Sequence, residues 1–234
     1  IYVIEVNPRA SRTVPFVSKA TGVPLANIAA RVMAGISLKE QNFTSEIIPK
    51  HYSVKESVFP FNKFLGVDPF LGPEMRSTGE VMGVGKDFPA AFDKAFLAAG
   101  DVVPSSGKVL VSLRKLDRGR LVELGERLIS QSFEIVATRT NQEILTKAGL
   151  ECTMINKVSE GSPHIVDAIK NDEISLIINS TEDSQGLEDA TVIRCQALIH
   201  KVPCLTTVSA AFAMLDGLKT QDKLVVRSLQ SIHN

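Results

Sequence analysis

The chain has 234 residues, 44% of them hydrophobic, and its 26 basic residues balance its 26 acidic ones. The apolar content excludes an intrinsically disordered protein, and the zero net charge gives no overall field that would attract nucleic acid or an anionic membrane. Cys152, Cys195 and Cys204 show no Cys-x-x-Cys spacing, so we expect reduced thiols in a cytoplasmic protein rather than disulfides or structural zinc. The sequence lacks a run of about 18 apolar residues, and we expect neither a membrane span nor a signal peptide.

The first hundred residues mix strand and helix patterns. Residues 1–7 alternate aliphatic and polar side chains, which predicts a strand, and so short a strand needs partners from elsewhere. We therefore expect the chain to be the C-terminal fragment of a longer protein, truncated inside a domain. The pattern then predicts, in chain order, helices over 15–20 and 24–34, strands over 52–61 and 78–84, and a helix over 89–99.

A small, polar stretch over 101–107 contains Gly, Pro and Ser and is the best candidate for a linker. Beyond it strands alternate with helices, and Ser162 is a natural N-cap before Pro163 at one helix start. The predicted strands cover 108–113, 133–137, 152–155, 175–179 and 205–208, and the predicted helices begin near 117, 142, 162, 187 and 210. This alternation predicts an α/β fold with a doubly wound parallel sheet, covered on both faces by helices.

Four polar residues near the start have the chemistry of a phosphoryl-transfer site. Glu5 and Asn7 share one face of the predicted strand, about 7 Å apart along the backbone. Carboxylate and amide oxygens suit Mg²⁺ or Mn²⁺, and the guanidinium groups of Arg9 and Arg12 suit phosphate or carboxylate oxygens. The same residues also fit a half-exposed strand that ends in an Asn-Pro turn, and the spacing leaves both interpretations open.

A second candidate site lies at the carboxyl ends of the predicted parallel strands. Ligands of open parallel sheets bind there, where helix N-termini and loop amides favour anions. The positions in question are polar or basic, namely Arg118, Thr138, Asn156, Lys157, Asn179, Ser180 and Thr181. A phosphate attached to a sugar or a base would fit such a set, although Asn, Ser and Thr also follow strands simply because they form turns.

Three stretches resemble one known family. The run from Ile4 to Lys19, which contains Glu5-Val6-Asn7-Pro8-Arg9, resembles the last metal-binding strand of an ATP-grasp domain, specifically that of the carbamoyl-phosphate synthetase large subunit family. The stretches 60–64 with 72–83, and 177–181, resemble the same family. The resemblance covers nearly the whole chain. It implies that residues 1–100 are an incomplete α+β ATP-grasp segment, that 101–107 are a linker, and that 108–234 are a Rossmann-like, methylglyoxal-synthase-like allosteric domain.

The family resemblance implies an ATP-dependent ligase that joins ammonia from glutamine to bicarbonate, for pyrimidine and arginine biosynthesis. In this half, ATP would phosphorylate carbamate. Glu5 and Asn7 would hold Mg²⁺ or Mn²⁺ with the ATP phosphates, and Arg9 and Arg12 would neutralise the transferred group. The implied partners are the remainder of the large subunit and a small glutaminase subunit in an oligomer, with no nucleic acid and no membrane. The fragment alone is expected to be inactive, because other parts of the ATP site are missing from it.

The family resemblance also assigns the second site to a regulatory nucleotide, UMP or IMP. Arg118 falls where the family has a basic residue, and Thr138, Lys157, Asn179 and Thr181 match contacts to the phosphate and ribose. Ser180 lies among them. Asn141 departs from the family, because a second threonine is common there. Glu56 and Thr206 match contacts to the activator ornithine, but Phe59 and Cys204 replace an expected leucine and an aromatic hydroxyl.

Two other functional interpretations stay open. In the first, the chain is a non-catalytic module that binds a nucleotide. In the second, it is a lyase like methylglyoxal synthase, although segment 137–142 lacks the Thr-Gly-Thr turn of that enzyme. The four histidines are too scattered to predict a metal site, and we expect Gly79, Gly83 and Gly85 to serve turns and tight packing.

Overall fold

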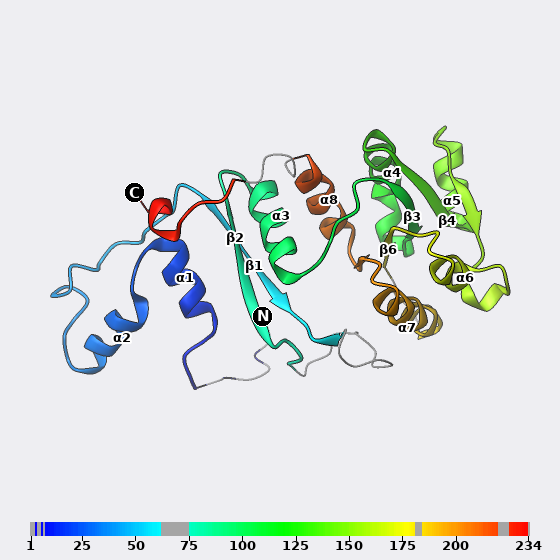
Figure 1. Ribbon diagram of the computed structural model, residues 1–234. Coiled ribbons are helices and arrows are strands. Elements are labelled where there is room, and N and C mark those ends of the chain that lie inside the picture. The colour runs from blue at the N-terminus through cyan, green and yellow to red at the C-terminus, as the bar shows by residue number, and fades with distance from the viewer. Residues whose placement is uncertain are drawn as a thin grey trace.

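The computed structural model describes residues 3, 6, 8–61, 75–180, 184–219 and 225–233, with the backbone alone at 184–187 and 229. Two regions follow one another along the chain and are joined by the segment 101–106 (Figure 1). Of the predicted strand over 1–7, only Val3 and Val6 are described, and neither is in a strand. Glu5 and Asn7, and the family-like segment 62–74, lie outside the described residues.

The first region begins with two short helices that confirm the predicted ones. Helix α1 (Thr13–Thr21) ends at Gly22, whose φ of 74° is in the left-handed region that glycine tolerates. Helix α2 (Leu25–Met33) follows and packs against α1. No residue of α2 is buried, although its apolar residues recur at helical spacing, and Met33 is 89% exposed.

An antiparallel pair of strands, β1 (Tyr52–Val58) and β2 (Gly79–Gly85), forms the rest of the first region together with helix α3 (Phe88–Ala99). Asp87 caps α3 by accepting a hydrogen bond from the N–H of Ala90 at 3.0 Å. A Cβ at Gly83 would overlap the Ala91 carbonyl oxygen and lie 2.5 Å from the Ala95 nitrogen. The expected role of Gly83 in tight packing is therefore confirmed, since only glycine lets α3 approach β2 this closely.

The second region alternates strands and helices as the sequence predicts. A five-stranded parallel sheet has the order β5-β4-β3-β6-β7. Its strands are β3 (Gly107–Ser112), β4 (Phe133–Thr138), β5 (Thr153–Ile155), β6 (Leu176–Asn179) and β7 (Cys204–Leu205). Its helices are α4 (Leu121–Ser130), α5 (Arg139–Lys147), α6 (Ile165–Lys170), α7 (Ser184–Ile199) and α8 (Val208–Leu218), with a 3₁₀ helix at Lys115–Arg120 before α4. The predicted doubly wound sheet is confirmed.

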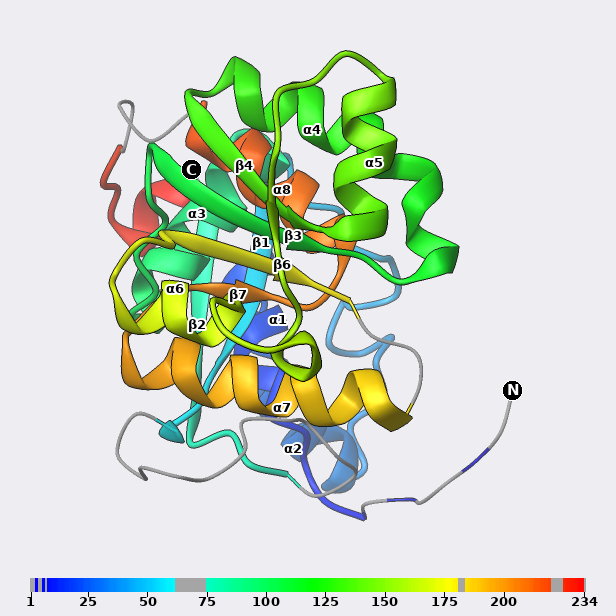
Figure 2. The ribbon, with the colours of Figure 1, turned by 90° about the vertical axis from the view of Figure 1, so that its right-hand side faces the viewer.

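Both faces of this sheet are covered (Figure 2). Successive residues of a strand point to opposite faces, so Val109 and Val111 lie in one hydrophobic cluster and Leu110 lies in another. The first cluster includes residues of α4, α5 and α8, and the second includes residues of α6 and α7. Burial on both faces explains why these strands read as nearly continuous apolar runs.

Several predicted boundaries were wrong. Strand β1 ends at Val58 rather than 61, and the helix predicted from 117 begins as a 3₁₀ turn, with α4 starting at Leu121. Two further cases show the contacts that decide a boundary. Helix α6 begins at Ile165 with His164 as its N-cap, not at Ser162. The reason is a reciprocal cap: the Asp167 carboxylate accepts from the His164 N–H at 3.0 Å, and the Asp167 N–H donates back to His164 Nδ1 at 3.4 Å. Strand β7 ends at Leu205 rather than 208, because the Thr207 hydroxyl accepts from the Ala210 N–H and starts α8.

The described C-terminal segment, 225–233, lies against the first region rather than the second (Figure 1). Lys94 Nζ in α3 donates to the carbonyl oxygens of Val84 and Val225 at 3.0 and 2.7 Å. His233 Nε2 donates to the carbonyl oxygen of Lys19 at 2.8 Å. The division of the chain at 101–107 stays a prediction, to which the structure adds this contact between the last residues and the first region.

Candidate ligand-binding site

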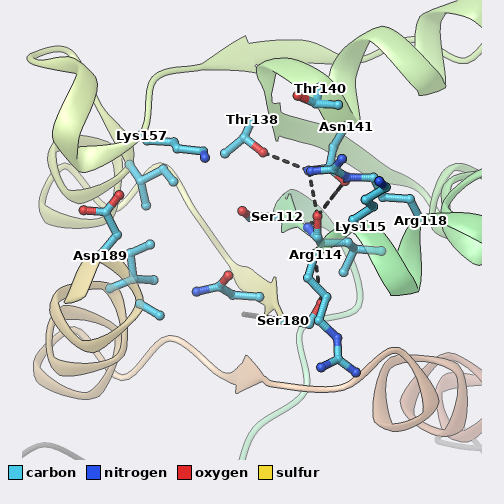
Figure 3. Close-up of a pocket in the computed structure, with 15 residues that line it drawn as sticks. Ser112, Arg114, Lys115, Arg118, Thr138, Thr140, Asn141, Lys157, Ser180 and Asp189 are labelled. Atoms are coloured by element: carbon cyan, nitrogen blue, oxygen red, sulfur yellow. Dashed lines mark hydrogen bonds between the residues drawn. The ribbon is translucent and has the colours of Figure 1, made fainter. Parts of the chain in front are cut away.

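A pocket of about 220 Å³ lies where the strand order of the parallel sheet reverses (Figure 3). From β3 the chain proceeds outward to β4 and β5, then returns to β6 on the other side of β3. The carboxyl ends of β3 and β6 therefore diverge into loops that run in opposite directions, which opens a crevice between them. Ser112, Thr138 and Asn179, the last residues of β3, β4 and β6, all line the pocket.

The structure brings together most of the residues that the sequence predicts for this site. Arg118, Thr138, Lys157, Asn179 and Ser180 all line the pocket, whereas Thr181 lies outside the described residues. Asn156 does not belong to it and instead lines a separate cavity of about 270 Å³ beside α6. The rule that ligands bind at the carboxyl ends of parallel strands therefore identified the edge of the sheet at which the structure has this pocket.

Sequence reasoning missed several other lining residues, namely Arg114, Lys115, Thr140 and Asp189. A signal for Arg114 and Lys115 existed, since they follow the predicted strand 108–113 directly and must lie at its carboxyl end. Asp189 lies inside the long helix α7, and its place on the same side of the pocket as Lys157 depends on how that helix packs. The pattern along the chain carried no comparable signal for it.

A hydrogen bond joins the ends of β3 and β6 beside the pocket, and an ion pair within the segment after β3 lies next to it. Arg114 Nε lies 2.7 Å from Asp117 Oδ2, and the Arg114 N–H donates to Ser180 Oγ at 3.2 Å. Hydrogen bonds from Arg114 and then Ser180 lower the pKa of the Asp117 carboxyl, against a smaller opposing effect of burial. Asp117 is therefore held as a carboxylate that neutralises part of the charge of Arg114.

Thr138, Asn141 and Leu113 form a connected group in the floor of the pocket. Asn141 Nδ2 donates to Thr138 Oγ1 at 2.9 Å and to the Leu113 carbonyl oxygen at 3.4 Å, and Oδ1 accepts from the Leu113 N–H at 3.4 Å. Arg118 Nε donates to the same carbonyl oxygen at 3.2 Å. These bonds join the end of β3 to the first turn of α5 and orient Arg118.

The charges around the pocket favour an anion that also carries a hydrogen-bond donor. Cationic side chains, namely Arg114, Lys115, Arg118 and Lys157, surround it. Asp189 is the carboxylate among the described lining residues, and it accepts a hydrogen bond from Ser159 Oγ at 3.2 Å. Lys157 and Asp189 lie on the side of the pocket opposite Arg118 (Figure 3).

The other predicted sites are less complete in the structure. Arg9 and Arg12 are described and exposed, and Arg12 precedes the first residue of α1. Within the ranges that the structure describes, no group of three or more His, Cys, Asp or Glu residues is placed to hold a metal ion. The proposed metal ligands, Glu5 and Asn7, lie outside those ranges. Their carboxylate and amide oxygens fit a hard divalent cation by chemistry alone.

Glu56 and Thr206, the residues matched to an ornithine site, lie in different regions. Glu56 is in β1, where burial chiefly raises the pKa of its carboxyl and the nearby Asp101 adds to the effect, against a backbone hydrogen bond from Ser57. Thr206 follows β7 and is exposed. Among the described contacts, no hydrogen bond or ion pair joins the two residues, and their shared site stays a prediction.

The fold and the pocket define a Rossmann-like α/β domain with a pocket lined by cations at the switch point of its sheet. Residues 120–206 match the family model of the MGS-like domain, and residues 1–41 match that of the carbamoyl-phosphate synthase L chain, ATP binding domain. By sequence, the chain belongs to the carbamoyl phosphate synthase large chain family.

Three relatives illustrate the match, each named carbamoyl phosphate synthase large chain. That of Pseudomonas syringae pv. tomato is 57% identical over 233 residues, and those of Vibrio cholerae and Xanthomonas campestris pv. campestris are 54% identical over the same length. In each case the alignment covers 100% of this chain and 22% of the relative. The chain thus spans about a fifth of the length of these relatives. Among the described helices, none combines the length and the apolar character needed to cross a membrane.

Proposed function

We propose that this chain is the C-terminal part of a carbamoyl phosphate synthase large chain, and that its second region is a regulatory domain that binds a nucleoside monophosphate. The observation that carries the proposal is the pocket at the switch point, where Arg118, Thr138 and Lys157 converge from three separate segments of the chain. Cations and hydroxyl donors at the carboxyl edge of a parallel sheet are suited to phosphate.

The two sides of the pocket suit the two ends of such an effector, UMP or IMP. The phosphate would lie near Thr138 and the cations, and the Asp189 carboxylate would accept a hydrogen bond from a ribose hydroxyl. Asn179 ends strand β6, which lies beside the central strand β3, and Ser180 follows it; both line the pocket and offer further polar contacts. Thr181 would follow them. A ligand with both a phosphate and a donor group uses this arrangement better than inorganic phosphate does.

The first region would contribute one wall of an ATP site in the longer protein. Glu5 and Asn7 would hold Mg²⁺ or Mn²⁺, which would bridge the ATP phosphates during phosphorylation of carbamate. Arg9 and Arg12 would neutralise charge on the transferred group, and their exposure leaves them accessible to it. The remainder of the large subunit and the small glutaminase subunit would complete a cytoplasmic enzyme for pyrimidine and arginine biosynthesis.

Ornithine would be a second effector, with Glu56 as its main contact. The Glu56 carboxyl is partly buried, and burial raises its pKa, so an ammonium group beside it would stabilise the carboxylate. Thr206 would supply a hydroxyl.

Calorimetry on the purified chain with UMP and IMP tests the regulatory assignment. We expect binding of at least one of them and a loss of about tenfold in affinity after Lys157→Ala, because a charge-assisted hydrogen bond is lost. Lys170→Ala, at the exposed end of α6, is the matched control and should bind as the unaltered chain does. Absence of binding by both nucleotides would reject the regulatory assignment.

An activity assay tests the role given to the first region. With ATP and carbamate supplied, the chain alone should form no carbamoyl phosphate, since only residues 1–41 match the ATP-binding family model. Sustained turnover by the chain alone would show that it holds a whole active site, against the proposal.

A further inference from the structure

Asn141 lines the pocket, but its side chain forms its hydrogen bonds with other residues of the protein. The residue is 1% exposed and lies in the first turn of α5. Its amide nitrogen donates to Thr138 Oγ1 and to the Leu113 carbonyl oxygen (Figure 3). An amide nitrogen has two hydrogens, so both are in use. Asn141 is therefore not itself a donor to a ligand.

The main chain of Leu113 determines which way the Asn141 amide points. A backbone N–H only donates and a backbone carbonyl only accepts. The Leu113 N–H faces Oδ1, and the Leu113 carbonyl faces Nδ2, each at 3.4 Å. The reversed amide would set donor against donor and acceptor against acceptor at both contacts. The atom nearest the Thr138 hydroxyl must therefore be the donating nitrogen.

This orientation determines the direction of the Thr138 hydroxyl. Thr138 is the N-cap residue of α5, yet its side chain makes no capping bond to the first turn. Oγ1 instead accepts a hydrogen from Asn141 at 2.9 Å. The hydroxyl hydrogen of Thr138 must then point to a different acceptor, and the side chain lines the pocket between Lys157 and Arg118 (Figure 3).

We propose that Asn141 is a positioning residue that fixes the Thr138 hydroxyl as a hydrogen-bond donor to an anionic oxygen in the pocket. The inference rests on the proposed effector site and adds the source of its selectivity. A phosphate oxygen can only accept, whereas a sugar hydroxyl or a water can donate or accept. A donor held in one direction therefore selects a nucleoside monophosphate over the nucleoside. Asn141 supports the phosphate site although it does not contact the phosphate.

The Asn141→Asp variant reverses the direction of the hydrogen bond between residue 141 and Thr138, and it leaves the side-chain volume nearly unchanged. A carboxylate at 141 would accept from the Thr138 hydroxyl and draw its hydrogen away from the pocket. We expect affinity for UMP or IMP to fall by at least about tenfold, while affinity for uridine or inosine changes by less than about twofold. The measurement is calorimetry with each nucleotide and its nucleoside, with the thermal midpoint of each variant as a check of folding.

Two further variants separate hydroxyl direction from added charge. Gln142→Glu makes the same change of amide to carboxylate at the next residue, whose side chain bonds Thr146 outside the pocket, and it should bind as the unaltered chain does. In a Thr138→Val background no hydroxyl remains to be redirected. The loss caused by Asn141→Asp should therefore be severalfold smaller there than with Thr138 present.

The outcomes distinguish this inference from the proposed function. If the unaltered chain binds neither UMP nor IMP, the effector site and this role of Asn141 both fail. If it binds one of them and Asn141→Asp keeps the preference for nucleotide over nucleoside, the effector site stands and the role of Asn141 is refuted. An equal loss with and without Thr138 would also refute it. If Asn141→Asp does not fold, Asn141→Leu takes its place, because it removes the same donors without adding charge. The quantity measured is again the ratio of affinity for the nucleotide to affinity for its nucleoside.

Discussion

The two regions of this chain bury their apolar surface in different ways. In the second region a five-stranded sheet is covered on both faces, and α4, α5 and α8 contribute to one hydrophobic cluster. In the first region the sheet has two strands, and α2 buries no residue at all. A sheet covered on both faces can present a preformed pocket, and Phe92 and Phe96 of α3 also pack against its larger cluster. An exposed apolar helix such as α2 leaves its region dependent on other surfaces for stability.

The largest expected effect tests this difference directly. Leu128 in α4 is fully buried, so Leu128→Ala should lower the free energy of unfolding by about 3 kcal/mol. Met33 in α2 is 89% exposed, and Met33→Ala should change it by less than about 0.5 kcal/mol. Urea unfolding of both variants measures the two values. Comparable losses would mean that α2 contributes to a core after all.

The close approach of α3 to β2 in the first region should give the next largest effect on stability when it is disturbed. Gly83→Ala would drive a methyl group into the backbone of α3, and we expect a loss of about 2 kcal/mol. Gly79→Ala is the control, because a Cβ there meets nothing within 4 Å. Thermal unfolding of the pair measures the difference. Unaltered stability of Gly83→Ala would mean that α3 moves freely away from β2.

The side-chain caps at the N-termini of helices should contribute equally to the free energy of unfolding in the two regions. Asp87 caps α3, and Thr207 caps α8, which packs against α3. Each change to Ala should lower the free energy of unfolding by about 1 kcal/mol, because an N–H in the first turn loses its acceptor. Arg12→Ala is the control, since Arg12 makes no side-chain capping bond to α1. A clear difference between Asp87→Ala and Thr207→Ala would show that one helix end has another partner.

The smallest effect concerns pH, and its sign should be opposite in the two regions. The pKa of Asp117 is lowered in the folded state, so its carboxylate adds stability above the unfolded pKa near 4, and this is lost as the pH falls through the folded value. Asp117→Asn should cost about 0.5 kcal/mol at pH 7 and nothing near pH 2, with partial exposure limiting the effect.

In the first region, ionisation of Glu56 should have the opposite effect on the free energy of unfolding. Its pKa is raised in the folded state, so ionisation above that pKa disfavours folding, and Glu56→Gln should stabilise the chain by about 0.5 kcal/mol at pH 7. The gain should vanish near pH 3, where the carboxyl is neutral in both states. Urea unfolding across the pH range measures both variants, and a shared sign would contradict the environments described for Asp117 and Glu56.

The sequence predicted the sheet of the second region because strands buried on both faces leave uninterrupted apolar runs. It predicted the edge of the sheet that holds the pocket because the carboxyl ends of parallel strands must meet. Short-range sequence patterns predicted a helix boundary wrongly where hydrogen bonds between particular side chains decide where the helix begins. Ser162 has the right chemistry for an N-cap, but the reciprocal bonds of His164 and Asp167 start the helix two residues later than Pro163.

The role of Asn141 was beyond the reach of pattern reasoning. Its residue type indicates only a departure from the family, whereas two of its three hydrogen bonds are to the main chain of Leu113, 28 residues earlier. Asp189 is similarly beyond prediction from the sequence, because only the packing of α7 brings it into the pocket beside Lys157. For Glu5 and Asn7 the prediction stands untested, since both lie outside the described residues.

The bond between Lys94 and the Val225 carbonyl has a consequence for cleavage of the chain. The second region is attached to the first through residues 101–106, through the packing of α8 against α3, and through the segment 225–233, in which His233 also bonds Lys19. A protease that cut the chain once within 101–106 would leave two pieces still bound to each other. The two regions would then migrate together on a sizing column and separate only in denaturant.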